Sequence, residues 1–416
     1  MKGEGRRPAH VPADRVVDFD IFNPPGVEQD YFAAWKTLQR PGAPALVWTP
    51  RNGGHWIATG GEQVRTLWGD AARLSSEALA VTPGLGDVMR FIPLQQDPPE
   101  HTPFRNAVMR GFANSQIAKL EPRVVALANE LIDSLIGRGH CEFVEEFAEV
   151  LPVNMFLTLI EVPVEDRPRL REFGKQLTRP DGSMTVEQLA QAADDYLWPF
   201  LKKRLETPGD DLFSRILSVP IEGRAWTVDE ARRMCRNLLF GGLDTVAAML
   251  GMVTLHLARN PQDQAALRAD AALIPAATDE LMRRYPTVSV TRNLVADVDM
   301  DGVTMKAGDL IYLPSVLHNL DPASFEAPEE VRFDRKLNVA RHTTMGNGPH
   351  RCVGAGLARM EVIVFLREWL RRMPDFRLDT DRPVRMRGGN VGACTAIPLR
   401  WNVHSGSGEI SATQQN

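Results

Sequence analysis

The chain has 416 residues, which is enough for a large buried core, and 44% of them are hydrophobic, as in an ordinary globular protein. Its formal net charge of −5 argues against nucleic-acid binding through bulk positive charge. Its four cysteines are far apart and form no CxxC pair, which argues against a disulfide framework.

The sequence begins MKGEGRR with no apolar run behind it, and no stretch of about 18 uncharged apolar residues follows anywhere. We therefore expect a soluble, cytoplasmic protein without a membrane anchor. No Ser/Gly linker and no repeat divides the sequence, so residues 1–416 are expected to form a single domain. Its ends, about 1–15 and 405–416, are expected to be flexible.

The patterning predicts a mainly α protein with small β-sheets (α+β). A turn rich in Pro, Asn and Gly predicts a hairpin over 44–60. Apolar spacing predicts helices over most of 100–285, including 118–137, 186–206 and 227–258. Strands are predicted over 292–313, where Asp301-Gly302 is a two-residue hairpin signal. An irregular segment, 321–351, precedes a helix over 355–372.

Cys352 stands in the segment Met345-Gly-Asn-Gly-Pro-His-Arg-Cys-Val-Gly354, just before that last helix. Glycines let the backbone turn tightly and approach a flat ligand. The positive end of a helix favours a thiolate over a thiol. A lone cysteine in a Gly-rich loop is more often a buried structural residue, so the surrounding pattern carries the functional interpretation.

The pattern GxGxHxCxG over 346–354 resembles the haem-binding loop of the cytochrome P450 superfamily, and the likeness extends over roughly 15–402. The resemblance is to its soluble bacterial class, and most to the camphor hydroxylase. It implies the cytochrome P450 fold, with a long central helix over the haem and the cysteine loop beneath it. It also implies non-covalent haem b with Cys352 as the iron ligand, and the absence of CxxCH argues against covalently attached haem. Met345 departs from the family's usual Phe.

The segment Leu238-Leu-Phe-Gly-Gly-Leu-Asp-Thr-Val246 lies inside an apolar helical pattern. Two adjacent glycines cost roughly 1 kcal/mol each in a helix interior, which indicates a kink or close ligand approach. The Thr245 hydroxyl can return to the carbonyl of Gly241. An acid beside an alcohol, Asp244 beside Thr245, suits proton delivery. The alternative is a packing kink with an exposed Asp. The segment resembles the oxygen-activating segment of the camphor hydroxylase.

The resemblance assigns further residues. Glu280 and Arg283 form an ExxR pair that, with Arg335, is expected to be a structural triad holding the cysteine loop; in isolation such a pair is usually a surface ion pair. The haem propionates are expected to contact His101, Arg105, Arg292 and His350, of which His101 and Arg105 share one helical face. The alternative for that pair is a solvated basic face.

By the same resemblance, the loop at about 78–96 covers an apolar substrate site. Met89 stands where the camphor hydroxylase has a Tyr that holds a ketone, although it could also point elsewhere. The candidate substrate residues are Met89, Leu94, Phe240, Val288, Asn390 and Val391. Losing a hydroxyl donor removes about 0.5–1.5 kcal/mol of orientation energy. We therefore expect a terpenoid or norisoprenoid such as an ionone rather than camphor.

No flavin or nicotinamide motif is visible, so electrons are expected from an acidic iron–sulfur ferredoxin, supplied by a ferredoxin reductase and NAD(P)H. Arg341, Arg351 and Arg359 are candidate contacts, or else ordinary solvated or propionate-binding arginines. The expected reaction inserts one oxygen atom from O2 into a C–H bond, in a monomer without nucleic-acid or membrane partners. The alternatives are a haem-based gas sensor or carrier without turnover, and a peroxygenase-type haem-thiolate enzyme. The Asp244–Thr245 pair disfavours both.

Overall fold

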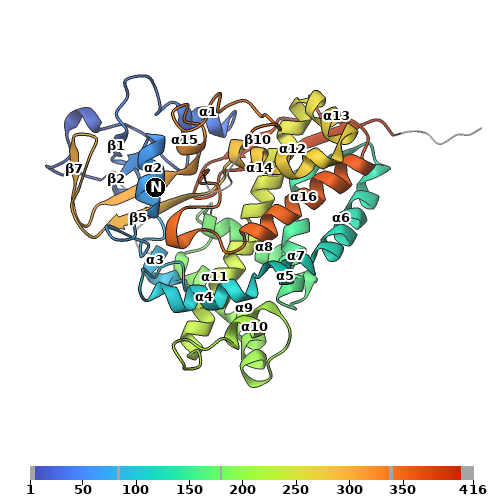
Figure 1. Cartoon of the computed structure of the whole chain (residues 1–416), viewed down its shortest axis with the longest axis horizontal. Coiled ribbons are helices and arrows are strands. Elements are labelled where there is room, and N and C mark those ends of the chain that lie inside the picture. The colour runs from blue at the N-terminus through green and yellow to red at the C-terminus, as the bar shows by residue number, and fades with distance from the viewer. Residues whose placement is uncertain (1–4, 82–84, 179, 337–340, 404–416) are drawn as a thin grey trace, which may run out of the picture.

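The computed structural model describes residues 5–81, 85–178, 180–336 and 341–403, and it confirms a mainly α architecture with small sheets. Figure 1 shows the largest sheet on one side of the molecule and most of the helices on the other. The helices are α1 Tyr31–Lys36, α2 Gly61–Gly69, α3 Leu85–Met89, α4 His101–Gly111, α5 Asn114–Ala118, α6 Glu121–Ile136, α7 Leu151–Leu159, α8 Arg167–Thr178, α9 Val186–Glu206, α10 Leu212–Leu217, α11 Val228–Leu243, α12 Thr245–Arg259, α13 Pro261–Ala269, α14 Ile274–Arg284, α15 Ser315–Asn319 and α16 Ala355–Arg372.

The strands form four small sheets. Their bounds are β1 Leu46–Thr49, β2 His55–Ala58, β3 Leu74–Ser75, β4 His140–Glu142, β5 Ser289–Leu294, β6 Val298–Met300, β7 Val303–Met305, β8 Leu310–Pro314, β9 Phe376–Leu378, β10 Arg385–Arg387, β11 Ala393–Ala396 and β12 Pro398–Trp401. The largest sheet has the order β1-β2-β8-β5-β3, the others β4-β12-β9, β10-β11 and β6-β7. The two expected hairpins are confirmed: Leu46 pairs with Ala58, and Val298 pairs with Met305.

The N-terminal end is more ordered than we expected from the sequence. Val11 has no exposed surface, and Ala13–Arg15 form a 3-10 turn. The buried side chain of Val11 anchors this segment to the core. The expectation of a flexible end is therefore wrong for residues 11–15. Residues 1–4 and 405–416, also expected to be flexible, lie outside the described residues.

The buried apolar side chains form two large clusters, and the long central helical segment passes through both. Met234 and Leu239 of α11 belong to one cluster, whereas Leu250 and Val253 of α12 belong to the other. The segment starts at a capping box, in which Thr227 and Glu230 each accept a hydrogen bond from the other's backbone N–H. The middle of the segment therefore lies at the boundary between the two cores.

The single helix expected over 227–258 is interrupted at that boundary. Asp244 has φ −130° and ψ −33°, which separates α11 from α12. The Thr245 hydroxyl donates to the carbonyl oxygen of Gly241 at 3.2 Å, as expected from the sequence. The hydroxyl thus occupies an acceptor that a regular helix would give to a backbone N–H.

The two glycines before the break have different surroundings. A Cβ at Gly242 would lie 2.6 Å from ring carbons of Phe156 on α7, so close packing requires glycine there. A Cβ at Gly241 would meet no atom within 4 Å, so Gly241 borders open space although Leu239 and Phe240 beside it are buried. Packing therefore requires Gly242, whereas no described contact requires glycine at position 241.

By length and composition alone, the helical segment Val228–Arg259 is apolar enough to cross a membrane. However, 78% of its most apolar window is buried inside the protein. A central core helix satisfies the same criterion, and the two clusters around α11 and α12 give it that role.

The glycine pair predicts opposite effects on stability. Gly242→Ala forces a methyl group against the Phe156 ring and should destabilise the protein by about 1–3 kcal/mol. Gly241→Ala meets no clash and should be neutral, or stabilising by up to about 1 kcal/mol through helix propensity. Denaturant unfolding of both variants measures the difference. Equal destabilisation by the two substitutions would contradict the assignment, and adding Phe156→Leu should rescue only Gly242→Ala.

Candidate functional site

The cysteine loop turns as its glycines predict. Gly346 and Gly348 have φ of +76° and +68°, a region that side chains disfavour. A Cβ at Gly348 would also lie 2.8 Å from the Cα of Gly69 on α2, so the loop packs directly on that helix. The Cys352 N–H donates to the carbonyl of Met345 at 2.8 Å and closes the turn just before α16.

The Cys352 side chain is accessible, although it lies deep among protein atoms. Burial raises the pKa of its thiol, while the Gly354 N–H and the charges of Arg105 and Arg351 oppose that shift. The Gly354 N–H therefore acts in the direction expected from the sequence, but without a metal ion on the sulfur the desolvation of the charged form outweighs it. A metal cation on the sulfur would reverse the balance, because a coordinating thiol is deprotonated outright.

The four residues predicted to contact the propionates lie in one cluster. The rings of His101 and His350 lie 4.4 Å apart between centroids, and the buried Nε2 atom of each has no hydrogen-bond partner in the described structure. Arg292 is 5% exposed, and the one described hydrogen bond of its side chain goes to the carbonyl of the adjacent Thr291. Arg105 donates to the carbonyl of Arg351 beside the cysteine.

The electrostatics of this cluster favour an anion. Burial and the neighbouring arginines lower the pKa of His101 to about 4 and that of His350 to about 3. Burial lowers the pKa of Arg292 to about 10, and Asp97 only partly compensates. Buried donors and a cation that Asp97 only partly compensates are costly unless a further anion meets them. The cluster therefore fits the two carboxylates of a haem, for which the accessible Cys352 could supply the iron ligand, and Gly241 leaves space open.

Asp244 and Thr245 lie at the break between α11 and α12. Asp244 is 6% exposed, and its Oδ2 accepts a hydrogen bond of 2.9 Å from the Thr178 hydroxyl at the end of α8. Thr178 was not expected from the sequence, because a contact across 66 positions leaves no local signal. The break thus places a hydroxyl and a buried carboxylate in consecutive positions, and α8 orients the carboxylate.

The expected triad is present and buried. Both nitrogens of Arg283 that face Glu280 donate to its carboxylate at 2.8 Å, and Arg335 Nε donates to Glu280 Oε1 at 3.0 Å. Asn319, which we did not expect, links this network to the segment before the cysteine loop. Its amide donates to the Thr344 hydroxyl at 2.8 Å and accepts from the Thr343 N–H at 2.9 Å.

The predicted substrate residues divide into two groups. Met89, Leu94 and Phe240 lie in or against the cluster that contains α11, where Phe240 packs on Phe91 at 5.7 Å between ring centroids. Met89 has no exposed surface, so a substrate would reach it only after neighbouring side chains moved. Its role stays a prediction.

The second group lies near Thr245. Val288 and Val391 form an isolated β-bridge and pack with Ala248, which follows Thr245 by three positions on α12. Asn390 is half-buried beside them, and its carbonyl accepts from the Ser289 N–H at 3.1 Å. These residues therefore border the same turn of α12 that carries the hydroxyl.

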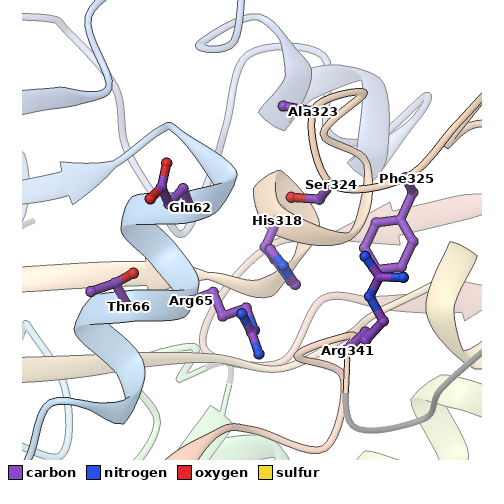
Figure 2. A pocket seen from close by; sticks show the side chains of 8 residues that line it. All are labelled: Glu62, Arg65, Thr66, His318, Ala323, Ser324, Phe325 and Arg341. Atoms are coloured by element: carbon purple, nitrogen blue, oxygen red, sulfur yellow. The ribbon is translucent and has the colours of Figure 1, made fainter.

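A separate polar pocket of about 360 Å³ lies beside the cysteine loop. Figure 2 shows Arg65 and Arg341 on two sides of it, with the buried His318 between them. Neither arginine makes a described ion pair, whereas Arg359 is held by Asp279 at 2.6 Å. The pocket connects to the loop, since the Asn347 amide donates to the carbonyl of Arg65 at 2.9 Å.

Comparisons with known proteins agree with this site. The cytochrome P450 family model matches residues 183–390. Probable cytochrome P450 127A1 of Sinorhizobium fredii is 32% identical over 403 residues, covering 95% of this chain and 96% of the relative. Steroid C26-monooxygenase of Mycolicibacterium smegmatis is 32% identical over 315 residues, covering 74% and 78%.

Solved structures extend the likeness to the whole fold. The crystal structure of cytochrome P450 CYP101C1 is 73% identical with a TM-score of 0.90, covering 95% of this chain and 100% of that chain. The structure of CYP101J2 is 40% identical with a TM-score of 0.88, covering 96% and 100%. The chain therefore belongs to the cytochrome P450 family of monooxygenases, with haem b as its cofactor.

Proposed function

We propose that this cytochrome P450 hydroxylates a small apolar terpenoid or norisoprenoid of ionone size, using O2 and electrons from an acidic ferredoxin. A ferredoxin reductase and NAD(P)H supply that ferredoxin, and the enzyme acts as a soluble cytoplasmic monomer. The observation that carries the proposal is the break at Asp244. It puts an acid and an alcohol beside an open position, Gly241, in the same molecule as the cysteine loop.

The protein's own residues divide the work. Cys352 would hold the iron, and the cluster of His101, His350 and Arg292 would hold the propionates. The haem, when bound, supplies oxygen activation and C–H oxidation. In the structure the Thr245 hydroxyl donates its proton to the Gly241 carbonyl. To deliver a proton at the break it would turn away from that carbonyl, and the buried Asp244 carboxyl group would resupply the proton. A gas sensor or carrier would not need this pair, and peroxygenase-type family members often lack it.

The apolar character of the candidate pocket supports the substrate class. Val288, Val391 and Ala248 form one apolar surface near Thr245, and Phe91 and Phe240 form another along α11. Asn390 is the one polar candidate among the predicted substrate residues. The name of one relative, steroid C26-monooxygenase, gives a steroid as the substrate of that protein.

A spin-state titration tests the substrate class. The holoenzyme should bind ionones more tightly than camphor, and the missing hydroxyl donor should cost camphor up to roughly tenfold in affinity. The haem spin shift measures both dissociation constants, after the reduced CO-bound spectrum has verified thiolate ligation. Tight camphor binding with weak ionone binding would overturn the substrate assignment without touching the family assignment.

Coupling measurements test the roles of Thr245 and Asp244. Thr245→Ala removes the hydroxyl at the break and should lower product formed per NADH by about tenfold or more, since positioned proton transfer contributes typically 10²–10⁴-fold. The lost electrons should appear as hydrogen peroxide. Thr254→Val is the matched control, because Thr254 is a fully buried threonine on the same helix with no described partner. Unchanged coupling in Thr245→Ala would remove this residue from proton delivery.

The ferredoxin would dock beside the cysteine loop, where Arg65 and Arg341 flank the polar pocket (Figure 2). Their lack of described ion partners leaves both charges available to carboxylates of an acidic protein. Arg351 is also exposed, whereas the bidentate contact of Arg359 with Asp279 makes that residue the weakest of the three sequence candidates.

Charge reversal tests this docking surface. Arg341→Glu should slow association with an acidic ferredoxin by roughly tenfold at low salt, and the difference should shrink as salt screens it. Stopped-flow reduction of the ferric enzyme at several ionic strengths measures the effect. Arg377→Glu on β9, in a different sheet, is the control. Equal rates for the two variants would move the docking surface elsewhere.

A further inference from the structure

The loop between β10 and β11 is held between two parts of the protein. On one side, the Gly392 N–H donates to the carbonyl of Thr287 at 2.8 Å, and Val391 bridges to Val288. These contacts tie the loop to the start of β5. Val391 also packs on Ala248, close to the turn that carries Thr245. The position of this loop therefore fixes how near Val391 lies to the break in the central helix.

The opposite side of the loop meets α1. A Cβ at Gly392 would lie 2.3 Å from ring carbons of Tyr31, a separation that real side chains do not reach. Gly392 does not have a positive φ, so space rather than backbone conformation requires glycine there. Successive side chains of an extended chain point to opposite faces. Since Val391 packs toward Ala248, position 392 faces away from α12.

Tyr31 cannot easily yield to a new methyl group. It is 1% exposed, and its ring makes edge contacts with Phe32 at 5.2 Å and with Trp35 at 6.5 Å. Trp35 in turn stacks on Tyr312 at 5.7 Å, and the Tyr312 hydroxyl donates to the Gly389 carbonyl at 3.2 Å. The aromatic cluster thus contacts the loop at two points, so an added side chain at 392 would displace the loop rather than the ring.

We propose that Tyr31 and Gly392 are positioning residues that set the depth of the substrate site by fixing how far Val391 projects toward the Thr245 turn. The inference rests on the proposed function, since it takes Val391 as a wall against an apolar substrate. Neither residue touches that substrate. A side chain at 392 pushes Val391 inward and narrows the space for bulky apolar rings.

The test compares Gly392→Ala with wild type by spin-state titration of the holoenzyme, using β-ionone and camphor as larger and more compact probes. A change of one methylene in the fit of an apolar pocket alters affinity by about tenfold or more. Narrowing the pocket in Gly392→Ala should therefore weaken β-ionone binding by that factor and camphor binding by less. Gly137→Ala is the control, because a Cβ there meets no atom within 4 Å. Its affinities should equal those of wild type.

Second-site variants separate positioning from general damage. Adding Tyr31→Leu to Gly392→Ala removes the ring from the clash and should restore β-ionone binding, whereas adding Tyr31→Phe keeps the ring and should not. Unchanged β-ionone affinity in Gly392→Ala, with an intact CO spectrum, would overturn the inference. Failure of the leucine variant to rescue a stably folded double variant would do the same.

A crystal structure of Gly392→Ala distinguishes this inference from the proposed function. Val391 should lie closer to Ala248 than in the wild-type protein, whatever the substrate is. If Val391 moves but neither probe shifts the wild-type spin state, the contact stands and the proposed substrate class fails. If Val391 stays in place, the inference fails while the substrate class is judged by the wild-type titration alone.

Discussion

The rest of the structure depends on one interruption in a buried helix. A continuous apolar helix through both cores would be stable, yet it would present only bonded backbone and packed side chains at its centre. At Asp244 the backbone leaves the helical region, and the Thr245 hydroxyl takes the Gly241 carbonyl as its acceptor. The protein tolerates this defect because packing of α11 and α12 in separate clusters stabilises each half independently. The boundary between two well-packed cores is thus where a reactive centre can have open space and polar groups.

The cluster of His101, His350 and Arg292 shows how the polypeptide is incomplete without its cofactor. Two imidazole nitrogens and a guanidinium are buried with few acceptors, an arrangement that costs free energy unless an anion satisfies it. For Cys352 the costly form is the anion, because burial raises the pKa of its thiol and a cation on the sulfur would offset that shift. Haem brings two carboxylates and a metal cation in one molecule. Cofactor binding therefore relieves both kinds of desolvation at once, which links holoenzyme stability to loading.

Sequence reasoning found the parts of this site that are local. The glycines around Cys352, the Asp244–Thr245 pair and the ExxR spacing are contiguous patterns, and each appears in the structure where the pattern placed it. It did not find Thr178, Asn319 or the Tyr31–Gly392 contact, because these join positions far apart in the chain and their residue types are common. The order of the N-terminal segment was not predicted either, since it depends on how much surrounding protein covers Val11. Periodicity likewise predicted one central helix, because the apolar pattern continues across the break.

Arg283 also determines the course of the irregular chain that precedes the cysteine loop. Its guanidinium donates to the backbone carbonyls of Asn319, Pro328 and Glu330, and so acts on main-chain atoms that every residue type provides. The shape of this segment is therefore held partly from outside, by Arg283 on α14, and partly from within, by Arg335, which donates to the carbonyls of Glu326 and Ala327. Side chains on its exposed surface are free to diverge under other pressures, such as recognition of a particular electron donor, without altering the path that leads to the iron ligand. Structural constraint and surface adaptability are in this way assigned to different side chains.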